Sequence, residues 1–181
     1  INGTRTGVFL GYKFDEYYDY KKLILDVEPQ SLLASFNGNL TAITPSRISY
    51  ILNLRGPSML IETACSSSLL AVHLACQSIR NNECEMAIAG GLKVSMIPLE
   101  TKEKLGIESS DGRARTFDER SDGTSMGEGI ISILLKPLNL AIRDKDSIYA
   151  VIKGSSSNQD GKSIGLTAVS YTHLRAHETG R

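Results

Sequence analysis

The sequence predicts an α/β fold in which layers of strands and helices alternate. Continuously apolar runs, typical of strands buried on both faces, recur along the chain as TGVFLGY, MLI, MAIA and IISILLK. Segments with helical spacing of apolar residues lie between them. The 181 residues contain no internal repeat and no low-complexity linker, so we expect one domain.

The first third of the chain predicts one strand and then helices. The strand TGVFLGY precedes DEYYDYKKLILD, which carries helix-forming and aromatic residues in a mixed pattern. Residues 31–57 predict a short helix, a turn at 37–39 and a second helix. Thr44 is the expected N-cap of the second helix, with Pro45 as its first residue.

The strand Met86–Ala89 runs into the pair Gly90-Gly91. Paired glycines after a buried strand predict either a close backbone approach or a turn with positive φ. No Lys-Ser or Lys-Thr follows the glycines, as a phosphate-cradling loop would require.

A long irregular loop is predicted at SSDGRARTFDERSDGTSMGEG, after a short helix at PLETKEKLGI. Such loops in compact domains are more often functional than idle. Asp118 and Glu119 offer an acid–base pair, but sequence neighbours rarely face one site, which favours ion pairs with Arg113, Arg115 or Arg120. The strand IISILLK, a helix at PLNLAIRDKD and a strand at SIYAVIKGSSSNQDG are expected to follow.

Cys65, in the stretch ETACSSSL, is the candidate functional residue. It stands where the apolar run MLI ends and the helical pattern SLLAVHLACQSIR begins. The N–H groups and dipole of a helix N-terminus stabilise negative charge and would favour a nucleophilic thiolate. A turn that aims a nucleophile from strand into helix also resembles the elbow of serine hydrolases. The alternative is a small buried cysteine, and spacing alone leaves both interpretations open.

Composition argues against several classes of function. Lys plus Arg and Asp plus Glu number 20 each, so the charge favours neither nucleic acid nor an anionic membrane as partner. No apolar run approaches the roughly 20 residues that span a bilayer. The N-terminal INGTRTG lacks the basic and apolar regions of a signal peptide. We therefore expect a cytoplasmic protein.

The cysteines and histidines predict neither a disulfide framework nor a metal site. The cysteines are odd in number and lack metal-ligand spacing; they are Cys65, Cys76 and Cys84. His173 and His177 stand at i and i+4 beside Glu178, but a zinc metallopeptidase helix would place Glu directly after the first His. We expect no metal and no directly bound cofactor.

Four longer motifs occur in a fixed order along the chain. They are PSRISYILNLRGPS, ETACSSSLLAVHLACQSIRNNECEMAIAGG, GRARTFDERSDGTSMGEG and GSSSNQDGKSIGLTA. Together they resemble the β-ketoacyl synthase (ketosynthase) domain of modular type I polyketide synthases, in the thiolase-like superfamily, from about Thr4 to Ala168. Glu62 stands where that family more often has Asp, and residues 124–126 depart from the aromatic and basic residues usual before GEG. Neither departure touches Cys65.

The resemblance implies a thiolase-like fold, layered αβαβα in full members, of which this chain supplies mainly the N-terminal half. It implies that Cys65 accepts an acyl chain as a thioester from the phosphopantetheine of an acyl carrier protein. A malonyl-type extender then loses carbon dioxide and attacks that thioester in a Claisen condensation, in polyketide or fatty acid biosynthesis. The family's partners are the carrier protein, a second copy in a homodimer, and other domains of a multidomain synthase.

The resemblance also implies that this chain is incomplete as an acyltransferase of the 3-oxoacyl-carrier synthase type. The family uses two histidines, in motifs like EAHGTGT and NIGH, and neither motif is present. After GLTA the sequence departs from the family. We therefore expect residues 1–168 to be a partial ketosynthase and the tail, residues 169–181, to be foreign or unstructured.

Two rival hypotheses remain. One is a Cys-dependent acyltransferase or hydrolase complete within these residues, with His73 or His173 as the base. The other is a non-catalytic fragment whose apolar faces lie exposed, with poor solubility as the result.

Overall fold

The computed structural model describes residues 1–13, 17–95, 106–159 and 161–162. The chain divides into two compact units, Ile1–Val151 and Ile152–Arg181. Among the described residues, helices and strands occur in the first unit alone: β1 (Thr6–Gly11), α1 (Tyr17–Val27), α2 (Leu32–Asn39), α3 (Thr44–Ile51), β2 (Ser58–Ile61), α4 (Ser67–Arg80), β3 (Met86–Lys93), β4 (Gly129–Leu135) and α5 (Leu138–Arg143).

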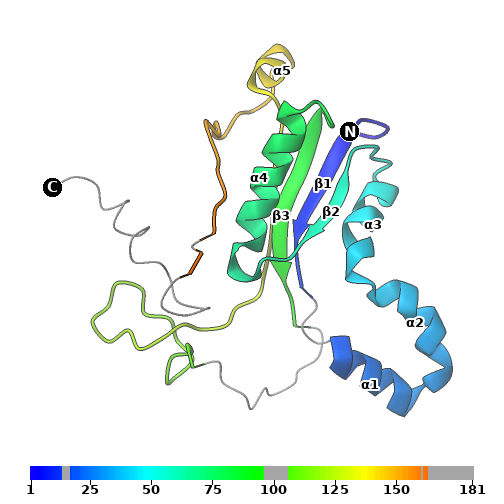
Figure 1. Cartoon of the computed structure of the whole chain (residues 1–181), viewed down its shortest axis with the longest axis vertical. Coiled ribbons are helices and arrows are strands. Elements are labelled where there is room, and N and C mark those ends of the chain that lie inside the picture. Colours follow the sequence, from blue (N-terminus) through cyan, green and yellow to red (C-terminus); the bar gives the residue numbers. More distant parts are fainter. Residues whose placement is uncertain (14–16, 96–105, 160, 163–181) are drawn as a thin grey trace. The chain divides into compact units, whose positions relative to one another are not determined.

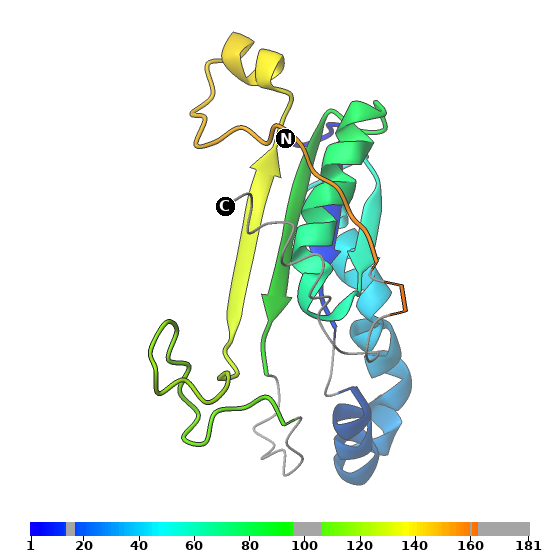
Figure 2. The same ribbon diagram turned by 60° about the vertical axis from the view of Figure 1, so that its left-hand side comes forward.

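The four described strands form one sheet in the order β2-β1-β3-β4, and Figure 1 labels the first three of them. β1 is parallel to both of its neighbours, with Phe9 in register with Met59 on β2 and with Ala89 on β3. β4 is antiparallel to β3 and lies at the edge, where Figure 2 shows it beside β3. The α/β prediction is confirmed.

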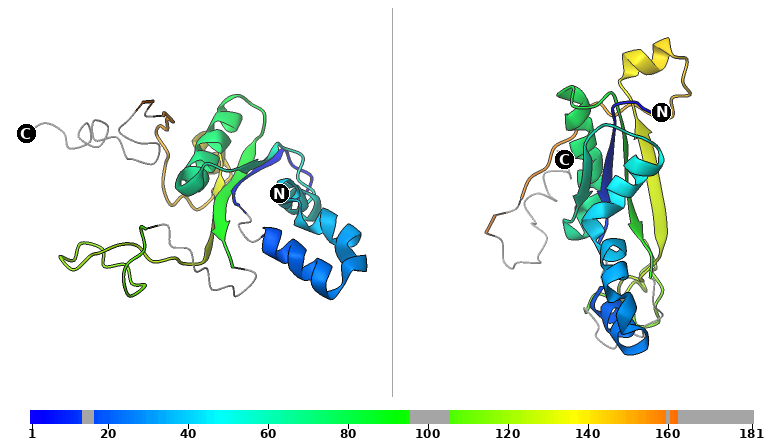
Figure 3. Two further views of the ribbon diagram at one scale, coloured as in Figure 1. Left: turned by 60° about the horizontal axis from the view of Figure 1, so that its bottom comes forward. Right: turned by 90° about the vertical axis from the view of Figure 1, so that its right-hand side faces the viewer.

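The core lies between the sheet and α4. Ala71, Ala75 and Ser78 recur at helical spacing and are buried, so their small side chains allow α4 to lie close to β1 and β3. Phe9 and Cys84 belong to the same buried region. Figure 3 shows α3 and α4 on different sides of β1, which accounts for the burial of every β1 residue.

The main expected elements form, but their limits differ in places. α3 begins at Thr44 rather than being capped by it, because a 3-10 turn at Thr41–Ile43 leads directly into the helix and Thr44 is already helical. The turn expected at 37–39 is wrong, since α2 continues to Asn39. The helix expected at PLETKEKLGI falls mainly on residues 96–105, outside the described ones.

β3 differs from expectation by continuing through its glycines. Gly90 and Gly91 lie inside the strand, and neither has a positive φ. Their close backbone contacts, described below, confirm the other prediction for the pair. The strand expected at SIYAVIKG is wrong: residues 147–154 are irregular, and no described strand pairs with them.

Candidate active site

Cys65 lies in a single-turn 3-10 helix, Ala64–Ser66, between the end of β2 and the start of α4. Its side chain is exposed, so the interpretation of Cys65 as a small buried residue is wrong. Cys76 is half-buried and Cys84 is buried. Cys65 is therefore the most accessible of the three cysteines, all of which lie in the described part of the chain.

The backbone just before Cys65 adopts an unusual conformation. Ala64 has φ of +51°, the left-handed region that residues with a Cβ rarely adopt. Such strain persists when the surrounding structure holds it, and it is common at functional sites. Here it turns the chain sharply from β2 toward α4.

Hydroxyl groups hold this turn on both sides of Cys65. Ser66 Oγ donates to the Thr63 carbonyl at 2.8 Å. Ser67 Oγ accepts from the Thr63 amide at 2.8 Å and donates to the Ala64 carbonyl at 2.7 Å. These hydroxyl bonds are not among the features expected from the sequence. The available signal was that Ser and Thr ahead of a helix tend to bond the local backbone.

α4 directs its N-terminus toward the Cys65 turn. The helix has 14 residues, and the residue at its N-cap, Ser66, makes no side-chain capping bond. The positive end of the helix dipole therefore lies one residue beyond Cys65 without a hydroxyl cap. The local field favours negative charge at this turn.

His73 is too far along α4 to serve as a base for Cys65. The two residues are eight positions apart, and a helical rise of about 1.5 Å per residue separates their backbones by about 12 Å. The His73 side chain leans toward the N-terminus of the helix, but the combined reach of the two side chains and one hydrogen bond is shorter than this separation, which excludes a direct hydrogen bond. His173, the other histidine of this rival hypothesis, lies outside the described residues.

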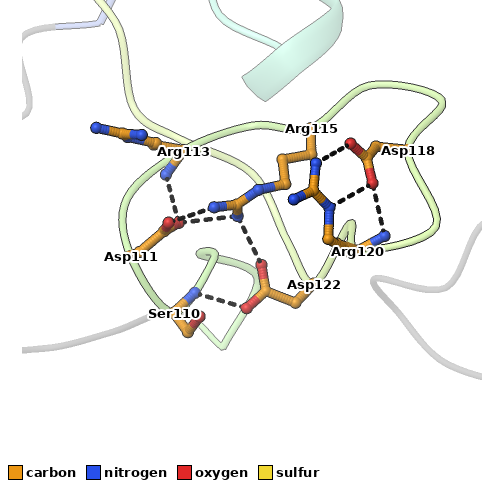
Figure 4. Close-up of polar contacts among 7 residues, drawn as sticks. All are labelled: Ser110, Asp111, Arg113, Arg115, Asp118, Arg120 and Asp122. Atoms are coloured by element: carbon orange, nitrogen blue, oxygen red, sulfur yellow. Dashed lines mark hydrogen bonds and ion pairs between the residues drawn. The ribbon is translucent and has the colours of Figure 1, made fainter.

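The loop of residues 106–128 is organised by ion pairs (Figure 4). Arg115 binds both carboxylate oxygens of Asp111, with Nη1 at 3.0 Å, and approaches Asp122 at 4.0 Å. Arg120 binds Asp118 in a fork at 2.8 and 3.0 Å. Within the pair considered above, Asp118 is therefore an ion-pair partner, as the sequence favoured.

These contacts keep the loop carboxylates charged. The hydrogen bond from Arg115 lowers the pKa of Asp111, and the bond from Arg120 lowers that of Asp118. The hydrogen bonds from Ser110 lower the pKa of Asp122. A general acid near neutral pH needs a raised carboxyl pKa, so this loop carries structural carboxylates instead.

Within the ranges that the structure describes, no three His, Cys, Asp or Glu residues are grouped to hold a metal ion. His173, His177 and Glu178 lie outside those ranges, as does the whole tail 169–181. No helix in the described part of the chain is long and apolar enough to cross a membrane.

Known proteins share this sequence and fold. Residues 1–141 match the family described as the β-ketoacyl synthase N-terminal domain. A phenolphthiocerol/phthiocerol polyketide synthase of Mycobacterium tuberculosis is 47% identical over 172 residues, which are 93% of this chain and 11% of that protein. The highly reducing polyketide synthase dmxL2 of Cryptosporiopsis sp. is 44% identical over 97% of this chain and 7% of its own length.

A solved structure agrees with the sequence relatives. The ketosynthase from module 6 of the bacillaene synthase of Bacillus subtilis aligns with a TM-score of 0.80 and 39% identity, covering 96% of this chain and 29% of that one. The chain thus spans about a tenth of its curated relatives and under a third of a solved ketosynthase. It belongs to the β-ketoacyl synthase family, with an α/β thiolase-like fold, and corresponds to part of a ketosynthase domain of the modular polyketide synthase type.

Proposed function

We propose that Cys65 is the acyl-accepting nucleophile of a ketosynthase. The observation that carries the proposal is its exposed position in a hydroxyl-bonded turn at the N-terminus of α4. The Cys65 thiolate attacks the thioester carbonyl of an acyl chain on the phosphopantetheine of a carrier protein. The new carbon–sulfur bond forms, the old one breaks, and pantetheine leaves as a thiolate that takes a proton from solvent.

Condensation is the second step of the proposal. A malonyl-type extender on the carrier loses carbon dioxide, and the resulting carbanion attacks the carbonyl of the Cys65 thioester. A carbon–carbon bond forms, and the Cys65–acyl bond breaks to return the thiolate. The backbone N–H of Cys65 supplies one donor for the tetrahedral oxyanion. In the parent protein a homodimer, further domains and a carrier protein accompany this reaction.

Acyl transfer is tested by mixing the chain with an acyl-pantetheine thioester and measuring its intact mass. We expect one added acyl group, which Cys65→Ala removes. Cys76→Ala is the matched control, because it removes a half-buried thiol from α4 and should keep the label. Labelling that survives Cys65→Ala and disappears with Cys76→Ala would contradict the proposal.

The isolated chain is proposed to be inactive in condensation, since neither histidine motif of the family is present. Residues 1–168 form the partial ketosynthase in this proposal, and residues 169–181 are foreign or unstructured. A [14C]malonyl-carrier assay on the 181-residue chain should give no ketoacyl product. Turnover at the rate of an intact ketosynthase would show that the chain lacks no residue needed for condensation, and would contradict this proposal.

Resequencing the gene past Ala168 tests the boundary at residue 168, and we expect a reading frame that continues into EAHGTGT-like and GH-containing motifs.

The exposure of β4 favours the non-catalytic fragment for the isolated chain. Ile130 and Ile131, which point to opposite faces of the sheet, are 71% and 73% exposed. Apolar surface of this kind binds hydrophobic dyes and reduces solubility. We expect Ile131→Lys to lower dye fluorescence, and Ser132→Lys, on the same strand, to change it less. A cooperatively melting monomer that binds no dye would contradict this expectation.

A further inference from the structure

Two glycines of the sheet face the first turn of α4. Gly11 ends β1, Gly91 lies in β3, and they are direct partners in register. A Cβ on Gly11 would lie 2.7 Å from the carbonyl carbon of Ser67 and from the amide nitrogen of Ser68. A Cβ on Gly91 would lie 2.8 Å from Ser68 Cβ. These separations are shorter than van der Waals contact. The first turn of α4 can therefore lie this close to the sheet only because both positions lack a side chain.

Glycine is needed at both positions because α4 lies close to the sheet, and not because the backbone conformation requires it. Neither Gly11 nor Gly91 has a positive φ, so alanine could adopt either backbone without strain. Gly90, the neighbour of Gly91, faces the opposite way, toward the backbone of Ile131 and Ser132 on β4. The contact with α4 is therefore specific to Gly11 and Gly91, which we call the glycine seat.

Movement at the seat would be transmitted to Cys65. Ser68, the residue that touches both glycines, lies three positions after Cys65. The Ser67 hydroxyl joins Thr63 and Ala64, so the residues before Cys65 are bonded to the start of the helix. Pushing the first turn of α4 away from the sheet thus moves the Cys65 turn with it.

We propose that the glycine seat positions Cys65, with Gly11 and Gly91 as positioning residues for the nucleophile. The inference rests on the proposed function for its meaning in catalysis. Its geometry is independent of that function, because it concerns only where the turn lies. Misplacing a reacting group by about 1 Å can cost up to about a hundredfold in rate.

The two members of the seat differ in a way that permits a rescue experiment. The nearest neighbour of a Cβ on Gly91 is a side-chain atom, Ser68 Cβ at 2.8 Å, which Ser68→Gly removes, and the next is the Gly11 carbonyl oxygen at 3.2 Å, which stays. The neighbours of a Cβ on Gly11 are backbone atoms of Ser67 and Ser68, which no substitution removes. Ser68→Gly should therefore rescue Gly91→Ala and fail to rescue Gly11→Ala.

The readout is iodoacetamide alkylation of the full chain across pH, resolved by cysteine with mass spectrometry. Cys84, which is 2% exposed, reports unfolding in the same sample. We expect Gly91→Ala to slow Cys65 alkylation about threefold, with Cys84 still protected, because the turn moves away from the N-terminus of α4. Adding Ser68→Gly should restore most of the rate, whereas adding Ser68→Ala, which keeps the Cβ, should not.

Several results would overturn the proposal that the glycine seat positions Cys65. Unchanged Cys65 kinetics in Gly91→Ala would do so, as would a change that appears only together with loss of Cys84 protection. Equal rescue by Ser68→Ala and Ser68→Gly would also do so. If Gly91→Ala alone does not fold, the double variant with Ser68→Gly must fold and alkylate at Cys65 like the unmodified chain. Because alkylation needs no carrier, extender or histidine, failure here is distinguishable from failure of the proposed acyl transfer.

Discussion

β1 and β4 are strands of one sheet with similarly apolar sequences and opposite burial. Every residue of TGVFLG in β1 is buried, whereas GIISILL in β4 is exposed at all positions but the last, which is half-buried. β1 lies between two strands and packs against α4 and α3, while β4 has β3 as its main neighbour. Two similarly apolar runs therefore both form strands here, and their burial differs because different elements pack against them.

The largest expected difference between the two strands is in their contribution to stability. Phe9 is 1% exposed in the core, so we expect Phe9→Ala to lower the free energy of unfolding by about 3–5 kcal/mol. Ile131→Ala on β4 removes little buried surface and should change it by less than about 0.5 kcal/mol. Urea titrations followed by circular dichroism measure both. Equal losses would show that β4 is covered in solution.

The pairing of β4 with β3 should depend on one glycine. A Cβ on Gly90 would overlap the Ile131 carbonyl oxygen and lie 2.9 Å from Ser132 Cα, both backbone atoms of β4. We expect Gly90→Ala to cost about 1–3 kcal/mol and to speed amide exchange in β4 more than in β1. Gly129→Ala is the matched control, because a Cβ there meets nothing within 4 Å. Similar exchange in the two variants would refute the steric account.

The difference between β1 and β4 also shows which features of the fold the sequence predicts. The apolar runs locate β1, β3 and β4, and the strand-to-helix junction locates Cys65, because these features depend on short-range periodicity. The sequence does not predict that β3 passes through Gly90 and Gly91, since that depends on how closely β4 and α4 approach. It also misses the irregular course of residues 147–154, because apolar composition alone does not make a segment pair with a neighbouring strand.

The hydrogen bonds of the Cys65 turn could not be predicted from spacing either. ETACSSSL indicates a nucleophile at a helix start, but which hydroxyl bonds which backbone group depends on the left-handed φ of Ala64. That conformation is rare for alanine, so propensity predicts against it. The strained residue lies beside the candidate nucleophile, where local rules are most often broken.

The smallest expected effect concerns α5, which follows β4. Ion pairs link Asp144, at the end of this helix, to two cationic side chains: Arg143 Nε lies 2.8 Å and Lys136 Nζ 2.7 Å from its carboxylate oxygens. The hydrogen bond from Arg143, and then that from Lys136, lower the pKa of Asp144 far below its usual range. The hydrogen bond that Lys136 donates to Asp144 is the main cause that raises the pKa of Lys136.

The signs of these shifts set a pH window for their contribution. A carboxyl whose pKa is lowered on folding stabilises the fold above its unfolded pKa, about 3.9, and the contribution is lost as pH falls toward the folded value. A lysine whose pKa is raised stabilises below its unfolded pKa, about 10.4, and loses this as pH rises through the folded value. The ion pairs of α5 should therefore contribute fully between about pH 4 and 10, whereas the burial of Phe9 in β1 carries no such dependence.

An NMR titration of the Asp144 carboxyl tests this account. We expect Arg143→Met to raise its pKa more than Lys136→Met, because Arg143 is the larger cause of the shift. Lys145→Met removes the same charge from the residue after Asp144, and should raise that pKa least. Added salt should weaken the effect in the unmodified chain, since the side chains of Arg143 and Asp144 are exposed and their interaction is screened. If all three variants titrate alike, the pairs at α5 do not form in solution, and the region that follows β4 lacks the support that the structure gives it.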